Sequence, residues 1–365
     1  MPGDTGPAAG YRRRRLRRPA YHKGVPADVL RTWVSRLETA RLTRPVLSPT
    51  ARSMRLIALA GVIADTAIMS TGEAVRLSSS GLGCPDWPQC SAADIVASKN
   101  AGQTLVNTWI EFANRLLNFP LVFITVLVFV AAWQFRPQGV RRRDLIWLAA
   151  IQPAGVFAQA AIGGIVVLTK LNPTAVSVHF LVSASIVAAA VVLHVRCTEG
   201  NGPPVPVVRR DLRVLSGALV AVTAIMLAAG TVVTGTGPLA GNAAAPRYKL
   251  PFEGVTQLHA DIAWLMTGLA VALVLGCRMS GAPPRAVRAS WIVLGAIGLQ
   301  GLIGYIQYFL HLPAGLVWVH VTGGVLVWIA VLRLFLSTRE RGPLTRPSPQ
   351  PAQTAPYLQP EPMDR

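Results

Sequence analysis

Eight stretches of the chain are each long and apolar enough to cross a lipid bilayer as a helix, which takes about 20 mostly apolar residues. They cover approximately residues 55–75, 106–133, 145–168, 175–195, 214–235, 257–277, 291–310 and 316–336. A backbone crossing hydrocarbon has no water to bond, so it satisfies its own N–H and C=O groups as a helix. With 52% hydrophobic and only 14% charged residues, the sequence predicts an all-α polytopic membrane protein with eight transmembrane helices.

Basic residues alternate between the connections of these stretches. The second, fourth and sixth connections carry the clusters Arg136, Arg141, Arg142 and Arg143, then Arg196, Arg209, Arg210 and Arg213, then Arg278, Arg285 and Arg288. The other connections carry far fewer. Because Lys and Arg in short loops stay on the cytoplasmic side, we expect a cell-membrane protein with both termini in the cytoplasm. The formal net charge of +19 resides in these loops and the tails, and does not indicate nucleic-acid binding.

The two ends of the chain are polar. Residues 1–53 are strongly basic and contain no short apolar core of a signal peptide, so we predict a cytoplasmic extension. A basic tail near anionic lipid is favoured there over a nucleic-acid-binding segment, and Met54 is an alternative first residue. Residues 338–365, which are rich in proline, are predicted to be a disordered cytoplasmic tail.

A sequence pattern occurs twice, over residues 159–179 and 300–320. Both copies share four positions at identical spacing, which are Gln159 and Gln300, Gly163 and Gly304, Val178 and Val319, and His179 and His320, and each copy has a proline shortly before its end, Pro173 or Pro313. The pattern predicts two four-helix repeats. With four spans in each, they have the same orientation in the membrane, related by an axis along the membrane normal. The first half covers residues 54–199, a cytoplasmic linker covers 200–213, and the second half covers 214–337.

Three histidines are predicted at one depth, near the outer ends of the fourth, sixth and eighth spans. They are His179, His259 and His320, and the matching position of the second span is Asn114, with Glu111 one turn earlier. A single intramembrane histidine often bonds a neighbouring helix, but three in one layer favour metal ligation. Two histidines that face each other from separate helices suit a six-coordinate haem iron better than tetrahedral zinc.

The two halves therefore differ. In the second half His259 and His320 are predicted to ligate one haem, whereas in the first half His179 faces Asn114. An ionisable carboxyl group near the membrane is costly, so Glu111 marks the first half as the chemical site. The alternative for Glu111 is an interfacial side chain paired with Arg115.

The remaining cysteines and acids have simpler interpretations. Cys84 and Cys90 lie in the first outer loop, where a disulfide is expected because zinc would lack further ligands. Cys197 and Cys277 are expected to stay reduced. Asp65, in the middle of the first span, is interpreted as a hydrogen-bonding group of a helix contact rather than part of a proton path.

Several motifs together resemble the haem A synthase family. They are Val75-Arg76-Leu77, the loop Ser80-Gly81-Leu82-Gly83-Cys84-Pro85-Asp86-Trp87-Pro88-Gln89-Cys90, Glu111-Phe112-Ala113-Asn114-Arg115, Val178-His179, Gln257-Leu258-His259-Ala260 and His320. The likeness covers residues 55–336, and the loop motif is its most specific part.

The resemblance implies an enzyme that oxidises the C8 methyl group of haem O to the formyl group of haem A by two hydroxylations, through a gem-diol that loses water. It implies a haem b cofactor held by His259 and His320, and a substrate haem held by His179 with Asn114 and Arg115. Glu111 matches the essential acid of the family. Asn114 is a departure, since many members have histidine there. The implied partners are a haem O synthase, an electron donor and the assembly of terminal oxidases.

Two other function classes are compatible with parts of the sequence. A non-catalytic cytochrome b-type electron carrier would hold haem but make no new porphyrin. A transporter with parallel repeats would lack haem absorbance. The cysteine loop favours the enzyme over both.

Overall fold

The computed structural model of this chain describes residues 43–91, 96 and 104–344. Contacts divide the chain into two units, Met1–Arg44 and Pro45–Arg365. The first unit lies almost wholly outside the described residues, as do most of the predicted basic extension and residues 345–365 of the predicted tail. All of the long helices belong to the second unit.

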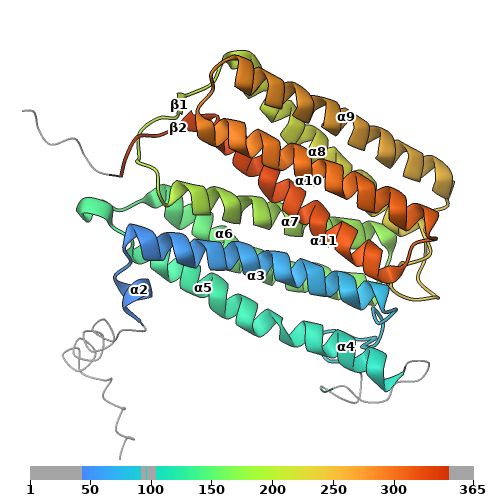
Figure 1. The fold of residues 1–365 in the computed structure, drawn as a ribbon. Helices are drawn as coiled ribbons and strands as arrows, with labels where there is room; N and C mark the ends of the chain where they lie inside the picture. The colour runs from blue at the N-terminus through green and yellow to red at the C-terminus, as the bar shows by residue number, and fades with distance from the viewer. Residues whose placement is uncertain (1–42, 92–95, 97–103, 345–365) are drawn as a thin grey trace, which may run out of the picture. The chain divides into compact units, whose positions relative to one another are not determined.

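Ten α-helices and one short strand pair make up the described chain (Figure 1). The helices are α2 Arg44–Leu47, α3 Ala51–Leu77, α4 Leu105–Leu116, α5 Asn118–Gln134, α6 Arg143–Leu168, α7 Pro173–Arg196, α8 Arg210–Thr236, α9 Phe252–Met279, α10 Pro284–Phe309 and α11 Ala314–Ser337. A 3-10 turn, η1, covers Pro137–Gly139, and the strands are β1 Val205–Pro206 and β2 Arg339–Glu340.

Eight of the helical spans are long and apolar enough to cross a membrane, which confirms the predicted all-α polytopic fold. Several extend beyond the predicted segments at their N-termini; α9, for example, begins at Phe252 rather than residue 257. Hydropathy marks only the apolar window of a helix, while polar and capping residues continue the helix past it. The second span is Leu105–Gln134 and combines α4 with α5.

The break between α4 and α5 falls at Leu117 and has a local cause. Pro120 has no N–H to donate to the carbonyl of Leu116, so the regular bond pattern is interrupted in the first turn of α5. Leu117 keeps a helical φ of −63° but a ψ of −14°, and its N–H still bonds Ala113 O over 3.2 Å. The span therefore continues across the break as two helices.

The long helices pack side by side in two groups of four (Figure 1). In one group α3, α5, α6 and α7 contact one another in turn, and in the other α8, α9, α10 and α11 do so. Helix α11 also packs on α3 and α7, and α7 packs on α8, so these helices join the groups. This grouping is compatible with the predicted parallel repeats, whose symmetry stays a prediction.

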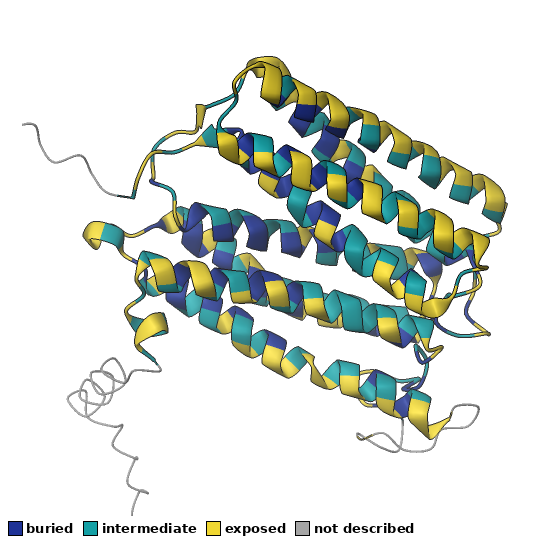
Figure 2. Cartoon of the chain, viewed as in Figure 1, coloured by how far each residue is buried: buried dark blue, intermediate teal, exposed yellow. Residues whose placement is uncertain are grey.

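Buried side chains concentrate toward one end of the bundle, the end near β1 and β2 (Figure 2). We call this the arginine end, because Arg142 and Arg196 are buried there. The apolar clusters of the described helices include buried residues between positions 184 and 193 of α7, 266 and 273 of α9, and 325 and 336 of α11. In each of these three helices the cluster lies between the histidine and the arginine end. The opposite end, which carries Cys84 and Cys90 and is called the disulfide end, is less tightly filled.

Buried charges and the strand pair tie the arginine end together. Asp144 accepts hydrogen bonds from Arg142 (2.8 Å) and Arg196 (2.5 Å), and Arg142 also donates to the carbonyl of Glu199 (2.7 Å). Strand β1, in the predicted linker, pairs antiparallel with β2, directly after α11. The start of the predicted tail is thus ordered against the linker.

Candidate functional site

Each of the three histidines lies against a glycine of the preceding helix. His179 on α7 faces Gly163, His259 on α9 faces Gly230, and His320 on α11 faces Gly304. A Cβ added to any of these glycines would lie 3.2–3.4 Å from the Cε1 atom of the ring, so a larger residue would crowd the imidazole. The repeated glycine therefore makes room for the histidine that ends the repeat.

His259 and His320 face each other, as the sequence predicts. Their ring centroids are 6.3 Å apart, and their planes meet at 66°. Two imidazole–metal bonds of about 2 Å, with about 1 Å from each nitrogen to its ring centre, give about 6 Å across a metal ligated from both sides. The spacing thus fits one metal ion between the rings.

Both histidines line a cavity of about 700 Å³. It lies within the range of about 300–1,000 Å³ common for ligand sites. Its walls are largely apolar but include threonine, glutamine and tyrosine side chains and three charged residues, Glu73, Arg76 and Glu253. The cavity is bounded by α8, α9, α10 and α11 with contributions from α3 and α7. The Nδ1 atoms of both histidines are buried without a hydrogen-bond partner among the described residues. Largely apolar walls and two facing imidazoles fit a bound haem.

The repeated glutamine attaches the histidine helix to the preceding one. Gln159 on α6 donates to the carbonyl of His179 over 2.8 Å and to Ser183 Oγ over 2.5 Å. In the second half Gln300 lies so close to α11 that a Cβ on Gly323 would be 1.9 Å from its Nε2 atom. The glutamine of the repeat therefore has a packing role beside each histidine.

Gly323→Ala tests this packing. The added methyl group has to displace the amide end of the flexible Gln300 side chain, so we expect a cost at the lower end of the range for overpacking, about 1 kcal/mol of stability. We expect a lower thermal unfolding midpoint in detergent, measured by circular dichroism. Gly315→Ala is the matched control, because nothing lies within 4 Å of its added Cβ. Equal unfolding midpoints for the two variants would contradict the role of Gln300.

In the first half, Glu111 is buried and bonded on α4. Its Oε1 atom accepts from Arg115 at 2.6 Å and 3.1 Å, and its Oε2 atom accepts from the backbone N–H of Cys84 at 2.9 Å. The pairing of Glu111 with Arg115, which the sequence raised as an alternative, is therefore present. Glu111 is nevertheless not exposed at the membrane interface, since the residue is only 5% exposed.

Arg115 fixes the loop between Gly81 and Cys90. Beside Glu111, it donates to the carbonyls of Cys84 (2.8 Å), Asp86 (2.9 Å) and Gln89 (3.2 Å). Charge-assisted bonds of this kind are stronger than bonds between neutral groups. The Glu111–Arg115 pair is thus a clamp on the loop, which sequence reasoning did not predict because carbonyl acceptors leave no mark in the sequence.

The loop itself contains the predicted disulfide, between Cys84 and Cys90. The ring of Trp87 packs against α6, because a Cβ added to Gly164 of that helix would come within 2.7 Å of it. The N–H of Gly81 donates to Gly241 O of the loop between α8 and α9 over 3.1 Å. The loop therefore contacts α4, α6 and the second half.

The other cysteines are thiols, as expected. Cys197 and Cys277 are both buried, and burial raises the pKa of Cys197, which follows α7, to about 12. A thiol with such a pKa stays protonated at neutral pH and is a poor nucleophile.

Asn114 has a buried amide oxygen without a hydrogen-bond partner among the described residues. The Nδ1 atom of His179 is in the same state. Because buried polar atoms are rarely left unpaired, both groups are compatible with a ligand in the first half. Asp65 has a partner of its own: with the amide nitrogen of Gln152 turned toward it, that nitrogen lies 2.6 Å from Asp65 Oδ2. This contact supports its interpretation as part of a helix contact.

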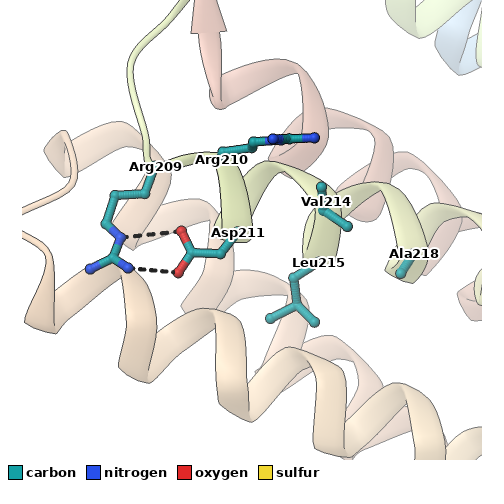
Figure 3. A pocket seen from close by; sticks show the side chains of 6 residues that line it. All are labelled: Arg209, Arg210, Asp211, Val214, Leu215 and Ala218. Atoms are coloured by element: carbon teal, nitrogen blue, oxygen red, sulfur yellow. Dashed lines mark hydrogen bonds and ion pairs between the residues drawn. The ribbon is translucent and has the colours of Figure 1, made fainter.

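A shallow, open surface depression lies at the start of α8 (Figure 3). Arg209 and Asp211 form an exposed ion pair at its edge, and the other lining residues are Arg210, Val214, Leu215 and Ala218. It has no histidine or cysteine, so its side chains do not offer a haem ligand.

Comparison with known proteins agrees with this arrangement. Residues 55–332 match the family described as cytochrome oxidase assembly protein. The chain belongs to the haem A synthase family within it. It is 27% identical to the haem A synthase of Bradyrhizobium sp. over 75% of this chain and 88% of that protein, and 27% identical to that of Rhodopseudomonas palustris over 68% and 77%.

A shorter match, to the haem A synthase of Lysinibacillus sphaericus, is 30% identical over 130 residues and spans 36% of this chain and 40% of that protein. The family match begins and ends within the eight-helix part of the chain. The resemblance seen in the loop and histidine motifs is thereby confirmed at the level of the family. The roles of single residues in this member are proposals.

Proposed function

We propose that this chain is a haem A synthase, an oxidoreductase of haem A biosynthesis that oxidises the C8 methyl group of haem O. Family membership supports the pathway, and the 6.3 Å spacing of His259 and His320 in a 700 Å³ cavity carries the assignment of a haem protein. Terminal oxidases would receive the product. A haem O synthase and an electron donor would act with this chain as partners.

The second half would hold haem b between His259 and His320, where it supplies electron transfer. Both imidazoles would bind the haem, and the largely apolar walls would limit the access of water to it. A site of that kind suits a fixed cofactor, because it leaves no open position at which a reactant binds.

The first half would hold haem O, with His179 as its ligand and Asn114 and Arg115 beside it. Asn114 has no ring nitrogen, so the face opposite His179 would stay open or weakly occupied. In each of the two hydroxylations one atom of dioxygen would be inserted into a C–H bond of the methyl group, and the other atom would leave as water with two protons and two electrons from the electron donor. The resulting gem-diol loses water to give the formyl group.

Glu111 would serve this site as a proton relay. Its carboxyl group accepts from Arg115 and Cys84, and it would take up a proton when one of those bonds is exchanged. The clamped loop would close the first half at the disulfide end. With the loops rich in arginine in the cytoplasm, this end would face outward from a cell membrane, and both termini would lie inside.

Extraction of haems from cells that co-express the chain with a haem O synthase tests the proposal. We expect chromatography to show haem A, which cells with the empty vector lack. Unchanged haem O beside a folded, haem b-containing protein would instead favour the electron carrier.

A further inference from the structure

The second-half cavity extends beyond the second half. Two charged side chains of α3, Glu73 and Arg76, line it together with Leu239 and Phe252 near the disulfide end. Helix α3 belongs to the first group of helices, so the cavity is completed by residues from the other half of the chain. Glu253 of α9 also lines the cavity, so among its described lining residues Arg76 supplies the one cation, and the rest of the wall is largely apolar.

Arg76 is held in place but still has donors to offer. Its Nε atom donates to Glu73 Oε2 over 2.9 Å, and its two Nη atoms donate to Glu73 Oε1 and to the carbonyl of Leu239. A guanidinium carries five N–H groups, and these contacts use three. Its side chain is 12% exposed and that of Glu73 is 9% exposed, so the pair sits in a partly desolvated position.

Two other arginines at the disulfide end are used differently. Arg115 is committed to Glu111 and three loop carbonyls. Arg247 donates to the carbonyls of Gly237 (2.8 Å), Ala245 (2.7 Å) and Pro238 (2.8 Å). Neither of them lines the cavity in the described structure. Arg76 therefore differs from both in combining a cation with access to the cavity.

We propose that Arg76, with Glu73 as its orienting partner, forms the anion-binding end of this cavity and takes a carboxylate of the bound ligand. For a haem held between His259 and His320, that carboxylate is a propionate; the assignment thus rests on the proposed function. A carboxylate in an apolar cavity is costly unless it is paired, and the remaining N–H groups of Arg76 can pair it.

Glu73 sets the strength of this site. Its charge holds the guanidinium in place, but it also repels a second carboxylate that approaches the same cation. Removal of the Glu73 charge is therefore expected to strengthen carboxylate binding, whereas removal of Arg76 weakens it. A role limited to holding α3 against the Leu239 loop would not produce opposite effects on an acidic ligand.

The test compares haemin with its dimethyl ester, in which both propionates are uncharged. Full-length protein is purified from haem-deficient cells and titrated with each porphyrin, and binding is followed by the Soret band. We expect wild-type protein to bind the free acid about ten-fold more tightly than the ester, as fits one charge-assisted bond. Arg76→Gln should bring that ratio to about one, with Glu73→Gln raising it.

Arg247→Gln is the matched control, since it removes a cation from the same end of the bundle outside the cavity. It should keep the wild-type ratio. Ester binding by Arg76→Gln with the wild-type spectrum shows that the variant is folded. The assignment is overturned if wild-type protein does not distinguish the two porphyrins, or if Arg76→Gln still does. Failure of wild-type protein to bind either porphyrin overturns the haem site itself, and this assignment with it.

Discussion

His320→Ala is expected to remove haem b from the purified protein, while His179→Ala keeps it. The two rings that face each other in the 700 Å³ cavity are His259 and His320, and a haem there loses one of two axial bonds when either is truncated. Even residues that only orient a metal ligand change metal affinity by about 10–100-fold, so loss of a ligand should cost at least about 100-fold. The haem-to-protein ratio and the absorption spectrum of the purified variants measure this.

His179→Ala is the matched control, because it truncates the same side chain at the same place in the repeat. The rings of His179 and His320 each lie against a glycine of the preceding helix, Gly163 or Gly304. The two changes therefore leave similar voids. His179→Ala should keep haem b and lose bound haem O. Equal loss of haem b in both variants would contradict the assignment of haem b to the second half and of haem O to the first half.

The sequence predicted the parts of this arrangement that depend on local pattern. Apolar windows located the spans, the spacing of the repeat placed His179 and His320 at one depth, and the short separation of Cys84 and Cys90 indicated their disulfide. Each of these depends on residues close together in the chain or on a repeated interval. Asp65 was interpreted correctly in kind, but its partner Gln152 was not predicted.

Apart from the facing of His259 and His320, contacts between distant segments were not predicted. Gly230, against His259, lies outside the repeated pattern, and a glycine in an apolar span gives no sign of what faces it. The other two histidines each have a glycine on the preceding helix. That pattern in the repeat could have indicated a glycine beside His259 as well. The position of Arg76 at the second-half cavity also depends on such a contact, because α3 packs against α11 of the other half.

Glu111→Gln is expected to lower haem A production by about 100-fold or more, the usual contribution of a positioned proton-transfer group. Haem b should stay bound, because Glu111 lies on α4 and does not line the second-half cavity. Glutamine has nearly the same shape and retains an oxygen for the N–H of Cys84, but it cannot take up a proton. Haem A is measured by extraction, and haem b by the spectrum of the purified protein.

A loss of activity in Glu111→Gln has two possible causes, because Glu111 and Arg115 also hold the Cys84–Cys90 segment in place. The rate at which a mild reductant opens the disulfide separates the two roles. If Glu111→Gln loses haem A while the disulfide stays as protected as in wild-type protein, the carboxylate acts in the chemistry. Arg115→Gln, which removes the bonds to three loop carbonyls, should expose the disulfide and serves as the positive control for loop opening. Wild-type haem A production by Glu111→Gln would refute the proton-relay role, and loss of haem A together with an exposed disulfide would reduce Glu111 to an anchor of the loop.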